Sequence, residues 1–335
     1  MKTLMRMAMI PCLLLLAGCG GFRFIIDIVP STHNLVETKV MGDEGGWRSQ
    51  PKVALIDVTG VISDSSRSGL FGSSENPVGR FAEALKKASR DSRVKAVIVK
   101  INSPGGTVTA SDLMYRELKH FKESTGKPVV ILMGGIAASG GYYIACAGDE
   151  IIANPTTITG SIGVIMQTVN FSEGMKRIGI RADAITSGPN KKVGSPLEPM
   201  SAEHRELLQG IVNELYASFR KVVVENRTKL DPALVDAITD GRVVTGIRAL
   251  ELGLVDQLGD IRDAFATAKQ RAGLTRATLV KYHRPTQHVG SPYAQSPGVP
   301  AQAGQIQLNL MQLNLGLPGM TDAAGFYYLW DPMVW

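Results

Sequence analysis

The stretch ILMGGIAASGGYYIACAGDEIIANPTTITGSIGV, residues 131–164, decides how the rest of the chain is interpreted. An apolar run over residues 129–133 predicts a buried strand that ends at Gly134-Gly135. Ser139 then stands at a glycine-rich turn, before an apolar helix predicted over residues 142–147. A helix that begins there directs backbone N–H groups toward developing negative charge. Two interpretations stay open, because Ser139 is either a nucleophile or only the N-cap of a buried helix.

Length and composition limit the class of protein. The chain has 335 residues, of which 44% are hydrophobic and 20% charged, and this indicates a globular protein with a sizeable core. The formal net charge of +6 comes without a dense Lys/Arg run, so we predict no nucleic-acid partner. Cys12, Cys19, Cys146 and the scattered histidines show no metal-ligand spacing. We therefore predict neither a metal site nor a cofactor, and interpret Cys146 as a small core residue.

The first residues have the pattern of an export signal. Lys2 and Arg6 precede an apolar run over residues 7–16, which is shorter than the roughly 20 residues that a transmembrane helix needs. Leu16-Ala17-Gly18-Cys19 resembles the bacterial lipobox, and the alternative is an uncleaved anchor helix. Either interpretation predicts attachment to a membrane of the bacterial cell envelope, with the globular part outside the cytoplasm on the periplasmic side.

Strand and helix patterns alternate through the middle of the chain. Strands are predicted over residues 53–58, 94–101, 128–133, 150–153, 162–166, 182–186 and 278–282. The main helices are predicted over residues 78–88, 110–121, 142–147, 261–272 and, as one long amphipathic helix, from residue 201 onward. This alternation predicts an α/β fold with a mainly parallel sheet flanked by helices.

Composition also predicts four segments along the chain. A signal peptide with lipobox is expected at 1–18, a membrane-proximal tether at 19–51, a single globular domain at 52–283, and a Pro/Gly/Gln-rich linker with an apolar tail at 284–335. The tail contains the aromatic run 326–330, which needs a neighbouring subunit, a groove or the membrane interface in which to bury.

Two glycine-rich turns follow predicted strands, Ser103-Pro104-Gly105-Gly106 and Ser139-Gly140-Gly141. In open α/β folds, ligands bind at the carboxyl ends of parallel strands. Acyl transfer needs two N–H donors directed at one oxyanion. Gly140 is one candidate donor, and Gly106 or Gly105 is the other.

A serine nucleophile also needs a base. No histidine lies close in sequence to residues 131–164, and lysine is the known substitute. A lysine serves as a base only when desolvation lowers its pKa from near 10.4 by roughly 3 units. The loop Asn190-Lys191-Lys192-Val193 offers two candidates, and the residues themselves do not choose between them.

Several motifs, in the same order, resemble bacterial signal peptide peptidase A of the short form, a family of serine proteases in the Clp-protease/crotonase fold group. The resemblance covers roughly residues 52–275 and implies that the domain at 52–283 is a serine peptidase of this fold. The matching pieces are residues 102–106, 137–143, 159–164, 187–191 with 194–196, and 240–242 with 253–256. Residues from 284 onward have no counterpart in the family.

The resemblance implies a role for each candidate site residue. Ser139 is implied as the nucleophile, Lys191 as the general base, and Ser161 as the group that orients the lysine amine. Gly106 and Gly140 are implied as the oxyanion hole. The implied substrates are remnant signal peptides and similar apolar peptides, held extended in a homo-oligomer whose neighbouring subunits complete the groove.

The spacing from Ser139 in that family favours Lys191 over Lys192. Two other functions stay open. A crotonase-like acyl-CoA enzyme would use the same glycines without a serine nucleophile, but CoA is cytoplasmic and the export signal disfavours it. A non-catalytic membrane scaffold of the same fold is disfavoured by the intact set of Ser139, Ser161 and Lys191.

Overall fold

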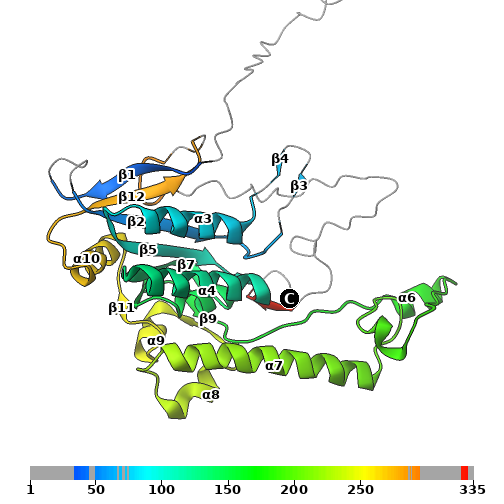
Figure 1. Cartoon of the computed structure of the whole chain (residues 1–335). Helices are drawn as coiled ribbons and strands as arrows, with labels where there is room; N and C mark the ends of the chain where they lie inside the picture. The colour runs from blue at the N-terminus through cyan, green and yellow to red at the C-terminus, as the bar shows by residue number, and fades with distance from the viewer. Residues whose placement is uncertain are drawn as a thin grey trace, which may run out of the picture. The chain divides into compact units, whose positions relative to one another are not determined.

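The computed structural model describes residues 34–44, 50–65, 68–69, 72–73, 75–285, 287, 289–294 and 326–330 (Figure 1). The predicted signal peptide and its lipobox lie outside these residues. Within the part that is described, no helix is long and apolar enough to cross a membrane.

A large, mainly parallel sheet forms the centre of the structure. Its strands lie in the order β1-β12-β2-β5-β7-β8-β11, while β9 also pairs with β7, and β10 pairs with β9. All of these pairs are parallel except β1 with β12 and β10 with β9. The predicted α/β fold with a mainly parallel sheet flanked by helices is therefore confirmed. The strand bounds are β1 Val36–Gly42, β2 Lys52–Thr59, β5 Val94–Ser103, β7 Val129–Ala138, β8 Glu150–Ala153, β9 Ile158–Gly160, β10 Val243–Thr245, β11 Gln257–Leu258 and β12 Thr278–His283.

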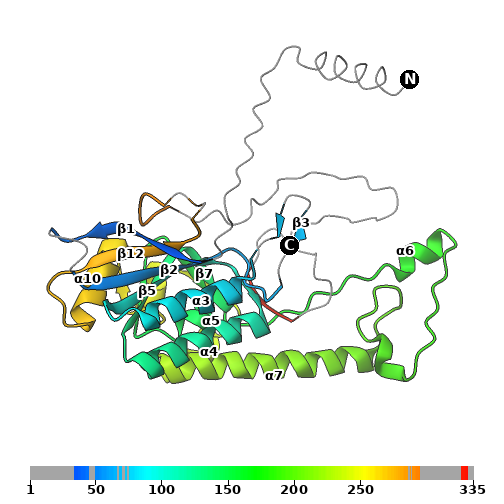
Figure 2. The same ribbon diagram turned by 45° about the horizontal axis from the view of Figure 1, so that its top comes forward.

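Helices cover both faces of this sheet (Figures 1 and 2). On β2, Val53 and Leu55 belong to the core cluster that contains α10, whereas Ala54 and Ile56 belong to the cluster that contains α3, α4, α5 and part of α7. Side chains of a strand alternate between its two faces, so β2 is buried on both. The helix bounds are α3 Pro77–Arg90, α4 Val108–Thr125, α5 Gly140–Ala145, α6 Ser172–Arg177, α7 Ala202–Asn226, α8 Val235–Ile238, α9 Gly246–Glu251 and α10 Ile261–Arg271, with short 3-10 helices η1 Pro189–Lys192 and η2 Pro232–Leu234.

Strand β7 does not stop at Gly134, as the sequence predicts, but continues to Ala138. Its register against β5 shifts there, because Ile101 pairs with Met133 while Ser103 pairs with Ala137. The extra residues form a bulge, and the side chain of Asn102 fills it by accepting a hydrogen bond from the Ile136 N–H at 3.2 Å. A Cβ at Gly134 would lie 3.0 Å from that side chain, so the glycine permits a bulge rather than ending the strand. The first half of β7 pairs with β8 and the second half with β9.

Two of the predicted strands do not form. Residues 162–166 give only a single bridge, between Ile165 and Tyr327, and residues 182–186 form no strand. Ile185 is fully exposed. The β-branched content of both stretches favours a strand, but a strand also needs a partner with which to exchange backbone hydrogen bonds.

The long helix α7 is also less buried than its apolar stripe predicts. Its C-terminal half packs into the core through Phe219 and Val223, whereas Leu207 is 40% exposed. In Figures 1 and 2 its N-terminal half extends away from the sheet.

The domain begins earlier than predicted. Residues 36–42 fall inside the predicted tether 19–51, yet they form β1, which pairs with β12 along its whole length. Leu35, next to it, is buried. The sequence pattern does not predict this strand, because a strand at the edge of a sheet lacks the unbroken apolar run of a buried strand, and many of its side chains are polar or partly exposed.

A buried ion pair joins the end of α7 to the edge of the sheet. The Arg227 guanidinium donates to both carboxylate oxygens of Asp256, each at 2.9 Å, and the Ile151 N–H donates to the same carboxylate at 2.9 Å. Burial by itself would raise the pKa of Asp256, but the hydrogen bonds and charge of Arg227 outweigh it and hold that pKa below 3.8.

Candidate active site

Ser139 connects β7 to α5 in a strained backbone conformation. Its φ of 52° and ψ of −116° are open to glycine but costly for serine, at about 1–3 kcal/mol. The Ser139 N–H donates to the Gly160 carbonyl at 2.8 Å, and the Tyr143 N–H donates to the Ser139 carbonyl at 2.9 Å, so the turn is fixed from both sides.

The Ser139 hydroxyl makes no capping hydrogen bond to α5. It is buried, and it has no hydrogen-bond partner among the described residues. The N-cap interpretation therefore does not account for a serine at this position. A strained serine with an unengaged hydroxyl is instead the pattern expected at a functional site.

Ser161 lies beside Ser139. Ala138 pairs with Gly160 in the β7–β9 ladder, and each serine directly follows one member of that pair. Ser161 has a φ of 51°, and within the described chain these two serines are the only non-glycine residues with positive φ. The structure thus brings together two of the residues to which the resemblance assigns roles.

The candidate oxyanion-hole glycines meet the same turn. A Cβ at Gly140 would lie 2.3 Å from the Ser111 hydroxyl oxygen and 3.2 Å from the Gly106 nitrogen. A Cβ at Gly106 would lie 1.8 Å from the Ile62 carbonyl oxygen. Only glycine fits at either position, and the backbones of the two glycines lie next to one another in the structure. Gly105, the alternative donor, has φ 105° and lies one residue earlier in the same turn.

Lys191 is not brought to this turn. It lies in η1, its side chain is exposed, and no hydrogen bond or ion pair of its ammonium is found among the described residues. Lys192, by contrast, forms an ion pair with Glu198. Of the two candidate lysines, Lys191 is therefore the one whose amine is not already engaged.

Residues 326–330 lie across the site as an extended segment. Strand β13, Tyr327–Leu329, pairs antiparallel with β6, Gly105–Thr107, so that Tyr328 lies opposite Gly106. On its other side, Tyr327 exchanges two backbone hydrogen bonds with Ile165, each 3.0 Å long. Of the three places left open for the aromatic tail, the structure shows a groove.

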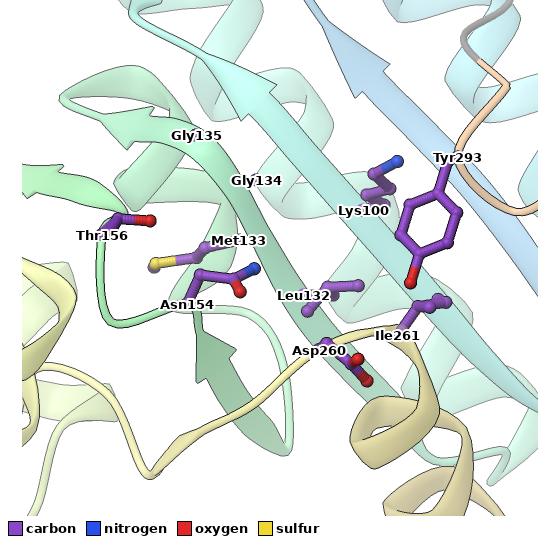
Figure 3. Close-up of a pocket in the computed structure, with 10 residues that line it drawn as sticks. All are labelled: Lys100, Leu132, Met133, Gly134, Gly135, Asn154, Thr156, Asp260, Ile261 and Tyr293. Carbon is purple, nitrogen blue, oxygen red and sulfur yellow. The ribbon is translucent and has the colours of Figure 1, made fainter.

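A hollow between the described residues lies away from Ser139. It has a volume of about 390 Å³ and lies between Lys100, Asn154, Asp260 and Tyr293 on the outer part of β5 and β7 (Figure 3). Burial lowers the pKa of Lys100 there. Ser139 does not line this hollow.

Cys146 takes the structural role that the sequence predicts. It lies in the hydrophobic core at the C-terminal end of α5, and burial raises the pKa of its thiol to about 12. At neutral pH it is therefore protonated and unreactive. No group of three or more potential metal ligands occurs within the described part of the chain.

Comparison with known proteins adds the family. A protein of Enterococcus faecium described as signal peptide peptidase SppA is 36% identical over 238 residues, which cover 71% of this chain and 69% of that relative. A protein of Synechocystis described as a protease is 38% identical over 226 residues, covering 68% of this chain and 76% of the relative. The family pattern "Peptidase family S49" matches residues 121–275. The chain belongs to peptidase family S49.

Other relatives of this S49 peptidase differ in length or are more distant. Protease 4 of Haemophilus influenzae is 35% identical over 69% of this chain, but the chain covers only 36% of that protein. Among solved structures, a membrane-bound stomatin-specific protease aligns with a TM-score of 0.43 and 17% identity, over 65% of this chain and 84% of that one. The prediction of a protease of the signal peptide peptidase A type is confirmed by the sequence relatives. These relatives also favour a protease over the acyl-CoA enzyme.

Proposed function

We propose that this S49 peptidase is a membrane-associated serine endopeptidase, with Ser139 as nucleophile and Lys191 as general base. The observation that carries the proposal is the backbone of Ser139, held at φ 52° with a buried hydroxyl that has no hydrogen-bond partner among the described residues. Strain of this kind persists only where the surrounding structure enforces it, and here β9 and α5 do so.

The chemistry of each step follows from that arrangement. The Ser139 oxygen attacks the peptide carbonyl carbon while its proton passes to the neutral amine of Lys191. The N–H groups of Gly106 and Gly140 stabilise the oxyanion of the tetrahedral intermediate. The lysine ammonium then donates its proton to the leaving amine, which produces a serine ester. Water, deprotonated by the same lysine, hydrolyses the ester and restores Ser139. Ser161 forms a hydrogen bond with the Lys191 amine and so orients it.

A lysine base must be desolvated and within hydrogen-bond distance of Ser139. Neither condition holds for the exposed Lys191 in one chain. The proposal therefore includes a rearrangement, in which the loop 187–196 reaches a serine either in its own chain or in a second copy.

The surface next to Lys191 favours a second copy. Residues 169–197 carry several exposed apolar side chains, and Ile178 and Ile180 are 73% and 50% exposed. Exposed apolar side chains gathered on one stretch mark an interaction surface. The others are Val169, Phe171, Ile185 and Leu197. We propose that these side chains are buried in a homo-oligomer, which also delivers Lys191 to the neighbour's Ser139.

Labelling with a serine-directed phosphonate tests the chemistry. We expect labelling and peptide cleavage by the wild type, and loss of both in Ser139→Ala. Lys191→Ala should lose cleavage as well. Lys192→Ala, whose side chain is engaged by Glu198, is the matched control and should retain most activity. Cleavage that survives Ser139→Ala would remove the proposal and favour a non-catalytic scaffold.

Mixing two inactive variants tests where the lysine comes from. The Ser139→Ala variant keeps Lys191 but lacks the nucleophile, and the Lys191→Ala variant keeps Ser139 but lacks the base. If the base acts between copies, refolding equal amounts of the two together restores about a quarter of the wild-type activity, because a site is complete only where a copy that keeps Ser139 lies next to one that keeps Lys191. Each variant refolded alone is the control. If the loop instead folds back in its own chain, the mixture stays inactive.

Substrate and location are also proposals. Relatives described as signal peptide peptidases support remnant signal peptides and similar apolar peptides as substrates. The export pattern of residues 1–19 supports attachment to the cell envelope with the peptidase domain on the periplasmic side. Cys19→Ser should abolish lipid incorporation if the lipobox is used, and should have no effect if an uncleaved helix is the anchor.

A further inference from the structure

Ser103 lies next to both glycine-rich turns of the site. It is the last residue of β5, it is fully buried, and it pairs with Ala137 of β7, two residues before Ser139. A Cβ at Gly141 would lie 3.0 Å from the Ser103 carbonyl oxygen and 3.6 Å from the Ser103 Cβ. Ser103 therefore packs beside the turn that carries Ser139, although in sequence it begins the other turn.

The Ser103 hydroxyl binds the backbone amide of Gly105. The Gly105 N–H donates to the Ser103 side-chain oxygen at 3.0 Å, and this hydrogen bond is buried. Pro104 has no N–H, so residues 104–106 contain only two amide donors, those of Gly105 and Gly106. Because the Gly105 amide is bound inside the protein, Gly106 is the donor that this turn can offer to an oxyanion.

A second contact sets the direction of the Gly106 N–H. The Gly105 carbonyl belongs to the same peptide group as that N–H, and it accepts a hydrogen bond from the Ile62 N–H at 2.8 Å. In a planar trans peptide the C=O and the N–H point in opposite directions. Gly106 has Ile62 on one side and the groove on the other, so its N–H faces the groove. The Gly106 nitrogen lies 3.2 Å from the position of a Cβ at Gly140, the other candidate donor.

The two glycines make these contacts necessary. Gly105 has φ 105° and Gly106 has no side chain, so the backbone has little torsional preference of its own at this point. Without the Ser103 hydroxyl, the buried Gly105 amide would lose its partner, and buried N–H groups are almost always paired. We expect the turn then to rotate toward another acceptor, and the Gly106 N–H to change direction with it.

We propose that Ser103 is a positioning residue for the reaction, whose hydroxyl holds the Pro104–Gly105 peptide so that the Gly106 N–H is directed at the developing oxyanion. Ser103 acts only through these glycines. The inference rests on the proposed function, because an oxyanion forms only if Ser139 attacks a carbonyl. It adds a third serine to the site and selects Gly106 rather than Gly105 as the donor.

Steady-state cleavage by the full-length chain tests the role of this hydroxyl. The probe is the methyl ester of acetyl-Ala-Ala-Leu, compared with the same ester carrying sulfur in place of the carbonyl oxygen. Sulfur accepts hydrogen bonds weakly, so an oxyanion hole favours the oxygen ester. Ser103→Ala should lower kcat by about 10- to 100-fold, because a misdirected donor costs less than a missing one, whose loss costs roughly 100- to 1,000-fold. KM should stay within about twofold, and the preference for the oxygen ester should shrink, because the donor acts in the transition state.

Further variants separate this role from packing. Ser103→Thr keeps the acceptor oxygen and should restore most of kcat and of the oxygen preference. Ser103→Cys offers a weak acceptor and should fall between serine and alanine. Thr278→Val is the matched control, because Thr278 is fully buried on β12, two strands from β5, and its hydroxyl donates to the Gln50 side-chain oxygen at 3.2 Å. It should lower Tm and leave kcat and the oxygen preference unchanged.

An unchanged kcat in Ser103→Ala would overturn the inference. A lower kcat with the oxygen preference intact would overturn it as well, because that pattern belongs to a structural defect. If Ser103→Ala does not fold, Ser103→Cys is judged by the same two measurements. Phosphonate labelling of Ser139 in the wild type is scored separately. Labelling together with an unaltered Ser103→Ala removes the inference alone, whereas a wild type that is neither labelled nor active removes the proposed function and the inference with it.

Discussion

Replacing Ser139 should stabilise the protein while it abolishes catalysis. In the structure, Ser139 has a buried hydroxyl without a partner among the described residues and a backbone held at φ 52° and ψ −116°. Ser139→Ala removes the hydroxyl and keeps the strained backbone, so it should gain about 1 kcal/mol, the low end of the cost of an unsatisfied buried group. Ser139→Gly also relieves about 1–3 kcal/mol of backbone strain, offset by about 0.5–1 kcal/mol of added freedom in the unfolded chain.

The expected order of stability is Ser139→Gly above Ser139→Ala above wild type. Thermal unfolding measures it, because each 1 kcal/mol shifts Tm by about 2–4 °C in a domain of this size. Urea unfolding at constant m-value checks that the gain lies in the folded state.

Ser111→Ala is the matched control. Ser111 is also buried, but its hydroxyl donates to the Thr107 carbonyl at 2.9 Å, so the alanine should cost about 1 kcal/mol. The reasoning is refuted if Ser139→Ala lowers Tm as Ser111→Ala does, or if Ser139→Gly is no more stable than Ser139→Ala.

Three further outcomes follow from contacts described above. Asp256→Asn leaves the buried Arg227 charge uncompensated and should cost about 3–5 kcal/mol in urea unfolding. The pKa of Asp256 is lowered in the folded protein. The stability that its ionisation contributes is therefore present above the pKa of the unfolded chain and is lost as the pH falls through the folded pKa. The variant lacks this carboxylate, so its free energy of unfolding should fall less steeply in acid than that of the wild type. Gly106→Ala places a methyl group 1.8 Å from a backbone carbonyl oxygen and should abolish cleavage. Gly210→Ala is the control, because a Cβ at this position in α7 has nothing within 4 Å. It should stabilise the protein by about 1 kcal/mol and leave cleavage unchanged. Cys146 should resist iodoacetamide in the folded protein and react after unfolding; mass spectrometry that finds rapid labelling of the native chain would contradict its burial.

Local patterns predicted the parts of the site that adjoin one another in sequence. The glycine-rich turn before the apolar helix follows from the local pattern, and the structure has Ser139 and Gly140 between β7 and α5. The position of Ser161 beside Ser139 depends on the pairing of β7 with β9, and for this residue only the family resemblance implied a role. The β-branched run of β5 predicted a buried strand for the same reason, since burial on both faces leaves an unbroken apolar stretch.

The parts that the sequence could not predict depend on distant partners. Residues 182–186 have the composition of a strand but no neighbour to pair with, while the partly exposed residues 36–42 pair with β12. The rings of Tyr143 and Phe219 lie with their centroids 5.1 Å apart, although no short motif links these two residues. In the proposed mechanism, Lys191 reaches a serine only after a rearrangement or from another chain, and the sequence of one chain does not show which.

The bulge in β1 bears on where an extended segment can pair with this molecule. One outer edge of the large sheet is β1, whose register slips between Lys39 and Met41, and the other is β11, which is only two residues long. Irregular and very short edges are poor templates for a further strand. Among the described strands, it is β6 that has accepted an extended segment on its free side. The outer edges of the sheet are therefore poor places for a further extended polypeptide to pair, whereas the edge of β6, next to the turn that carries Ser139, accepts one.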